Sequence, residues 1–135
     1  MKPLRLSLKK REILRGYQTF SRVITEGQSL QKGPVRCFFA TTPGRTGTLR
    51  VGFSVSRSVR NAVERNRARR WMKETYRRNK QLLGGALRVS SEPLDVVFMA
   101  RVRERLPRTP GSRSAIDQAM IALLKELHQH LSDKP

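Results

Sequence analysis

The sequence predicts an α+β fold, in which a small four-stranded sheet packs with three helices in the order α-β-β-β-α-β-α. Two segments carry apolar residues at helical spacing, and between them lies a long arginine-rich segment without glycine or proline. The remaining apolar segments are short and rich in residues that favour strands. A length of 135 residues suits one hydrophobic core. We therefore expect one domain over residues 1–135, with residues 1–8 as a flexible basic arm and residues 132–135 as a tail.

The first helix is expected from about Lys9 to Glu26, and Gly27 is expected to end it. Its apolar residues fall on one stripe of a helix. They are Leu14, Tyr17, Phe20, Val23 and Ile24. A first strand is expected to begin near Ser29–Leu30.

The next two strands, Val35–Thr41 and Leu49–Ser56, are predicted to form a hairpin, because a turn containing Pro43 and Gly44 joins them. Apolar and polar residues alternate along both. The polar face of the second strand carries only small residues beyond Arg50, so another group can approach the sheet closely there. Those small residues are Gly52, Ser54 and Ser56.

The last strand and the last helix follow a basic loop that contains Pro107 and Pro110. Leu94–Ala100 precedes this loop and is apolar enough to be a strand covered on both faces. Ser114 is expected to open the final helix with a sequence resembling a capping box. The apolar stripe of that helix consists of Ile116, Met120, Leu123, Leu124, Leu127 and Leu131.

The central helix, Arg60–Lys80, carries a one-sided positive charge, with Asn61 as its expected N-cap. At about 100° per residue, most of its basic side chains fall within an arc of roughly 140°. Only Glu64 and Glu74 supply negative charge within it, so the arginines cannot all pair inside the helix. A solvated helix paired with scattered acids is one interpretation. Arginine grips phosphate oxygens two at a time, so a polyanionic partner is the other.

The overall composition favours an anionic partner, because 29 basic residues, 21 of them arginine, face only 10 acidic residues and give a formal net charge of +19. Charge alone does not distinguish nucleic acid from an anionic membrane. No apolar run is long enough to span a bilayer and no signal peptide is visible, so we expect a cytoplasmic protein that does not bind membranes. Cys37 is the single cysteine, so we expect it to be buried and without a disulfide.

The sequence shows no recognisable catalytic constellation. Its acidic residues are scattered singly, and His128 and His130 lie two residues apart on a helix, where they face different ways and are expected at the surface. No cysteine and histidine spacing fits zinc, and no glycine-rich loop fits a nucleotide. The sequence therefore predicts a binding protein without catalytic residues and without a metal site of its own.

The segment Phe53–Arg70, FSVSRSVRNAVERNRARR, resembles the signature of the bacterial ribonuclease P protein subunit, whose "RNR" motif it contains. The resemblance extends over roughly residues 10–130. It implies a left-handed crossover through the third strand, the arginine helix and the fourth strand, which is the rare hand for such a unit. It also implies an endonuclease in which a large RNA, using Mg²⁺ that it binds itself, hydrolyses the 5′ leader from precursor tRNA. The protein would be the non-catalytic partner, one copy per RNA.

The resemblance further implies two RNA-binding surfaces. The helix surface for the catalytic RNA would consist of Asn61, Arg65, Asn66, Arg67, Arg69, Arg70 and Lys73. A cleft between the first helix and the sheet would bind the single-stranded leader of precursor tRNA through Phe20, Phe38, Ser54, Ser56 and Arg57. Ordinary core packing is the alternative for both phenylalanines. The chain departs from the family pattern at Ile24, Ser58 and Arg60.

Two other functions share the small size and the basic charge. A structural RNA-binding protein of the ribosomal type would need no cleft. A DNA-binding protein would need a recognition helix that presents groove-reading side chains, often within a dimer.

Overall fold

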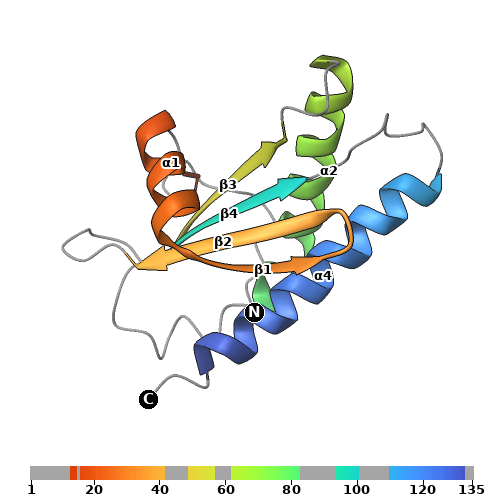
Figure 1. Cartoon of the computed structure of the whole chain (residues 1–135). Helices are drawn as coiled ribbons and strands as arrows, with labels where there is room; N and C mark the ends of the chain where they lie inside the picture. Colours follow the sequence, from red (N-terminus) through yellow and green to blue (C-terminus); the bar gives the residue numbers. More distant parts are fainter. Residues whose placement is uncertain are drawn as a thin grey trace, which may run out of the picture.

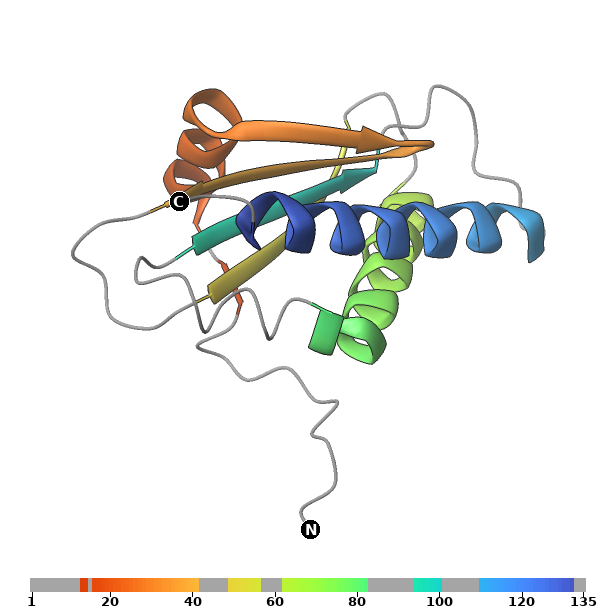
Figure 2. The ribbon, with the colours of Figure 1, turned by 90° about the horizontal axis from the view of Figure 1, so that it is seen from below.

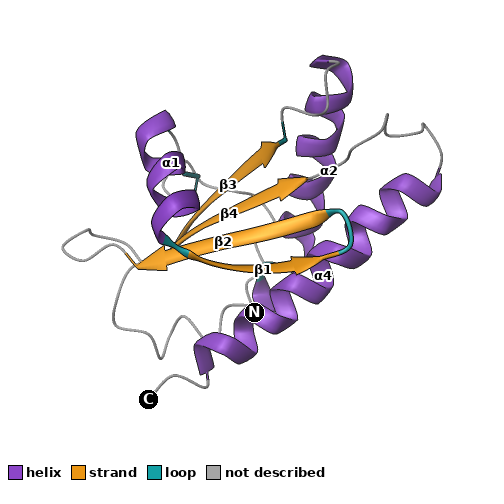
Figure 3. Ribbon diagram, viewed as in Figure 1, coloured by secondary structure: helices purple, strands orange, loops and turns teal. Residues whose placement is uncertain are grey.

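The computed structural model describes residues 13–14, 16–41, 49–56, 62–82, 94–100 and 110–132. Within this part of the chain, three helices and a four-stranded sheet follow the predicted α+β order (Figures 1 and 3). The elements are α1 (Tyr17–Glu26), β1 (Gln28–Lys32), β2 (Val35–Thr41), β3 (Leu49–Val55), α2 (Ala62–Asn79), β4 (Leu94–Ala100) and α4 (Pro110–Ser132).

The sheet has the strand order β1-β2-β4-β3, so the predicted hairpin between β2 and β3 is wrong. β4 lies between these two strands, antiparallel to β2 and parallel to β3. Six of its seven residues are buried, and a central position removes more of this apolar strand from water than an edge would. The hairpin instead joins β1 to β2, and its turn contains Gly33 at a φ of 51°.

The connection from β3 through α2 to β4 is the left-handed crossover that the family resemblance implies. α2 and α4 cover one face of the sheet, while α1 lies on the other (Figures 1 and 2). Seen from the side of α2 with both strands pointing upward, β4 lies to the left of β3 (Figures 1 and 2).

The two faces of the sheet bury two separate apolar clusters. The larger lies under α2 and α4 and includes Cys37, Phe98 and the predicted stripe of α4. Five residues of that stripe are fully buried, which confirms it: Ile116, Met120, Leu123, Leu124 and Leu127. The smaller cluster lies under α1 and contains Leu14, Val23, Phe38 and Val97, with Phe20 packed against it.

α1 begins at Tyr17, later than the predicted start near Lys9. Ile13 forms a parallel bridge with Val51, and the Leu14 N–H donates to the Val51 carbonyl at 2.9 Å, so this stretch adds to the edge of β3. Gly16, at a φ of 97°, then turns the chain into the helix. The predicted helix began too early because the apolar spacing from Leu14 to Ile24 continues across the turn at Gly16, and spacing alone does not reveal that turn.

The other helix ends also differ from expectation in detail. α1 ends at Gly27 as predicted, but this glycine is extended, and a Cβ there would lie 2.5 Å from the Val23 carbonyl oxygen. α4 begins at Pro110, so Ser114 is inside the helix rather than its cap. α2 begins at Ala62, and its expected N-cap, Asn61, lies outside the described residues. The Thr75 hydroxyl hydrogen bonds to the Asp117 carboxylate and ties α2 to α4.

The burial of Cys37 on β2 predicts a low reactivity of its thiol, which can be measured. The side chain is fully enclosed, and this desolvation raises the pKa of the thiol well above its usual range. The thiolate is the reactive form, so we expect Cys37 to resist alkylation by iodoacetamide in the folded protein at mildly alkaline pH. Mass spectrometry should show complete alkylation once guanidinium chloride is added. Equal rates in both conditions would contradict the buried placement.

Candidate nucleic-acid interface

A hollow of about 870 Å³ opens beside the edge of β3, between α1 and α2. Both faces of β3 contribute, since Phe53 and Val55 point to the side of α2 while Ser54 and Ser56 point to the side of α1. β3 is an edge strand whose neighbour in the sheet is β4, and among the described residues Ile13 forms a bridge with it at Val51. The lining residues Ser54, Val55 and Ser56 therefore lie farther along β3 than Val51, the residue that Ile13 and Leu14 contact.

Phe20 forms part of the α1 wall of this hollow, together with Ser21 and Ile24. Its ring lies against the backbone of β3 so closely that a Cβ on Gly52 would be 2.3 Å from its Cζ. The free space that the sequence predicted above Gly52 is thus occupied by the protein's own ring. Phe20 packs on the smaller cluster and lines the hollow at the same time, which combines the two interpretations of this residue.

Phe38 does not belong to this lining among the described residues. It is 9 % exposed and packs with Val23 and Val97 in the smaller cluster. The structure therefore places Phe38 in the smaller apolar cluster, and its contact with the leader stays a prediction. Ser54 and Ser56 do line the hollow, and Ser56 is fixed by its N–H, which donates to the Ala100 carbonyl at 2.9 Å. Arg57 lies outside the described residues, as do Ser58 and Arg60.

Arg65 and Arg69 of α2 line the opposite wall of the hollow. They are one helical turn apart and so lie on one flank, where the Arg69 Nη2 donates to the Asn66 Oδ1 at 2.6 Å. Sequence reasoning assigned these arginines and Phe20 to separate surfaces, but the structure brings them to one hollow. The crossover from β3 places α2 beside this strand, a relation that a helical wheel does not contain.

Arg67 lies on a different flank of α2. Its guanidinium carbon is 5.6 Å from the centre of the Trp71 ring, and Trp71 packs against the larger cluster. Arg70 and Lys73 are exposed. The residues of the motif therefore do not form one continuous face.

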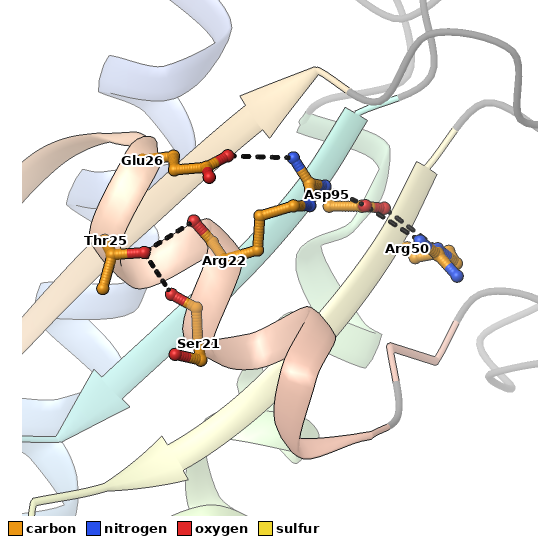
Figure 4. A network of polar contacts seen from close by, with 6 residues as sticks. All are labelled: Ser21, Arg22, Thr25, Glu26, Arg50 and Asp95. Atoms are coloured by element: carbon orange, nitrogen blue, oxygen red, sulfur yellow. Dashed lines mark hydrogen bonds and ion pairs between the residues drawn. The ribbon is translucent and has the colours of Figure 1, made fainter.

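A buried carboxylate that sequence reasoning missed holds the α1 wall in place (Figure 4). Asp95 of β4 is fully buried, and Arg50 of β3 donates to it through Nε and Nη2, each at 2.9 Å. Arg22 of α1 donates to the same carboxylate at 3.2 Å and lies 3.9 Å from Glu26. The only sign in the sequence was a lone aspartate in the apolar run LDVVFMA.

Among the described residues, no three or more histidine, cysteine, aspartate or glutamate side chains gather closely enough to hold a metal ion. The two histidines are partly buried, contrary to the expected surface position, and His130 packs edge-on against Phe39 at 5.2 Å. None of the described helices is both long and apolar enough to cross a membrane.

Comparison with known proteins gives concordant matches. The family model described as Ribonuclease P matches residues 8–128. The chain is 36 % identical over 118 residues to the ribonuclease P protein component of Pelotomaculum thermopropionicum, which covers 87 % of this chain and 94 % of the relative. It is 33 % identical over 98 residues to that of Clostridium novyi, which covers 73 % and 80 %.

Solved structures share the fold. The RNase P protein from Thermotoga maritima superposes with a TM-score of 0.66 and 28 % identity, over 86 % of this chain and 97 % of that one. The RNase P protein of Staphylococcus aureus, at 19 % identity and a TM-score of 0.53, covers 90 % of this chain and 92 % of its own and shows likeness of fold alone.

The contact between Phe20 and Gly52 predicts a strong coupling between the two positions. Gly52→Ala should destabilise the protein by about 1–3 kcal/mol, because the ring must leave its place. In a Phe20→Ala background the same change should cost less than about 0.5 kcal/mol. Urea unfolding followed by circular dichroism measures both values. Ser54→Ala is the matched control on the same strand face, and its effect should be additive with Phe20→Ala. Additive losses for Gly52→Ala would show that the ring does not lie there.

The hydrogen bonds of Arg22 and Arg50 to the buried Asp95 predict unequal contributions of the two arginines to stability. Arg50→Met should reduce the free energy of unfolding by about 3–5 kcal/mol, because it removes two of the hydrogen bonds to a buried carboxylate. Arg22→Met should cost about 1.5 kcal/mol, because it removes one. Thermal and urea unfolding of both variants check the order, and equal losses would contradict the geometry.

Proposed function

The chain belongs to the ribonuclease P protein family, and from this premise we propose that it binds the catalytic RNA of that enzyme and the 5′ leader of precursor tRNA. It would thereby assist an Mg²⁺-dependent cleavage that gives mature tRNA 5′ ends. The chain is a protein component of a ribonucleoprotein nuclease. We propose which RNAs it contacts, namely the catalytic RNA and the leader of precursor tRNA.

The hollow is the observation that carries the leader proposal. It is lined by an aromatic ring, that of Phe20, on one wall and by two arginines, Arg65 and Arg69, on the other. Single-stranded nucleic acid is bound by this combination, because a base stacks on the ring while guanidinium groups contact the backbone. Such stacking tolerates any base, which suits a protein that meets many different leaders. The hydroxyls of Ser54 and Ser56 add hydrogen-bonding groups.

The protein's own contribution to the reaction would be binding and charge neutralisation. Hydrolysis and the Mg²⁺ that supports it belong, in this proposal, to the RNA. A net charge of +19 reduces the repulsion between a catalytic RNA and its RNA substrate. Less Mg²⁺ is then needed for the two RNAs to associate. The proposed compartment is the cytoplasm, and the proposed complex contains one protein per RNA.

The two alternative functions gain no comparable support. A structural role in a ribosome would not require the hollow. The matched relatives are described as ribonuclease P protein components.

Reconstitution tests the division between protein and RNA. The purified protein should not cleave precursor tRNA, and its addition to the catalytic RNA should lower the Mg²⁺ concentration needed for half-maximal cleavage at physiological salt. A leader-release assay over a Mg²⁺ series measures this. Cleavage by rigorously RNA-free protein would reject the proposal, and so would an unchanged Mg²⁺ requirement.

Replacement of Phe20 tests the leader contact. Phe20→Leu keeps apolar packing against Gly52 but removes the ring face, so precursor tRNA should bind the holoenzyme more weakly by about 1–3 kcal/mol. Mature tRNA, which has no leader, is the control and should bind as before. Equal losses for both ligands would assign Phe20 to packing alone.

A further inference from the structure

We infer that the arginines of α2 divide between two RNA ligands, with Arg65 and Arg69 contacting the leader while Arg67 and Arg70 contact the catalytic RNA. This inference rests on the proposed function and assigns its partners residue by residue. It differs from the expectation from the sequence, which gave all four arginines to the catalytic RNA.

The positions around α2 require the division. At about 100° per residue, Arg67 lies about 160° away from both Arg65 and Arg69. Arg70 lies about 60° from Arg67 and about 100° from Arg69. A helix with its side chains is about 10–12 Å wide, so a single strand in the hollow cannot also follow the opposite flank. Arg65 and Arg69 line the hollow, and neither Arg67 nor Arg70 belongs to its lining among the described residues.

The far flank of α2, defined as Val63, Arg67, Arg70 and Trp71, has features of a binding surface. Val63 is 60 % exposed, the one large apolar side chain so exposed among the described residues. It precedes Arg67 by one helical turn, as Trp71 follows it by one turn. Arg70 is exposed beside them. An apolar group, a ring and two guanidinium groups together suit the sugar and phosphate surface of RNA.

Arg67 is held in place by Trp71, and no ion pair of Arg67 is found within the described part of the chain. Its guanidinium lies over Trp71, while its Nε and Nη2 atoms are buried and have no hydrogen-bond acceptor in the described part of the chain. Glu74 is already engaged by Arg77 and Arg78. Donors without acceptors are unfavourable, so a phosphate that accepts from the planar fork of Arg67 would lower the free energy of this side chain.

The two flanks also differ in the kind of RNA that they fit. The hollow is concave and contains an aromatic ring, which suits a flexible single strand whose bases can unstack. The far flank is the convex side of a helix, and Trp71 anchors its arginine to the core of the protein. A fixed guanidinium suits phosphates whose positions are already set by a folded RNA. We therefore assign the far flank to the catalytic RNA.

Two double variants provide a matched test, because each removes two positive charges from the same helix. Arg67→Ala with Arg70→Ala should weaken binding to the catalytic RNA and reduce the log–log salt slope by about 1.5, or roughly 0.7–0.9 per phosphate. Arg65→Ala with Arg69→Ala should instead reduce, by about tenfold, the preference of the holoenzyme for precursor tRNA with a long leader over one with a single leader nucleotide. Each pair should change the other measurement by less than about twofold.

Trp71→Leu separates position from charge. It keeps apolar packing against the core and all arginines, yet removes the ring beneath Arg67. We expect weaker binding to the catalytic RNA with the leader preference unchanged, after urea unfolding has shown that the variant is folded. Unchanged binding to the catalytic RNA would show that the ring does not present Arg67 and would overturn this assignment.

The outcomes distinguish the division from the proposed function. If the wild-type protein binds neither RNA, the proposed function fails, and the division fails with it. If it binds both RNAs and the two double variants weaken both activities equally, the division alone is overturned.

Discussion

The parallel pairing of β3 with β4 is the constraint on which the rest of this structure depends. Because the two strands are parallel, the chain must cross from the C-terminal end of β3 to the N-terminal end of β4, at the opposite end of the strands. The helix α2 lies in this connection. The same pairing sets Arg50 opposite Asp95, so the register that forms the sheet also forms the ion pair. Because Arg22 joins that pair from α1, one buried carboxylate connects the strands to the helix that carries Phe20. Fold and candidate site therefore share a single set of contacts.

Three of the acidic residues that the structure describes serve the protein's own structure. Asp95 holds three elements together, Asp117 hydrogen bonds to Thr75 between two helices, and Glu126 pairs with Lys32 at 3.2 Å. These carboxylates already have partners within the fold, so they do not neutralise the other basic residues of a chain with a net charge of +19. The excess positive charge remains on the surface, where mutual repulsion opposes the compact state. A ligand that binds only the folded protein adds to its stability, so a polyanionic partner would stabilise this fold as well as use it.

Under the proposal, the helix that contains the RNR motif would be a wall of one RNA site and the platform of another. One flank borders the hollow beside β3, and the opposite flank carries an arginine on a tryptophan ring. A helix is well suited to this double role, because residues two apart point in nearly opposite directions while the backbone stays rigid. A dense motif of alternating arginines can thus address two neighbouring RNA surfaces at once.

The sequence by itself determined the class of fold, the order of its elements, the apolar stripe of α4, the bounds of β2 and the burial of Cys37, because each follows from local periodicity and polarity. The RNR motif also identified the family before any coordinates. Only the tertiary structure decided that β4 lies between β2 and β3, that α1 begins after Gly16, that Phe20 reaches the hollow while Phe38 does not, and that Asp95 anchors α1. These features depend on which distant segments pair and on the hand of one crossover. The pairing of β4 with β2 and β3 joins residues 45 to 65 positions apart, and no short window of sequence contains both partners.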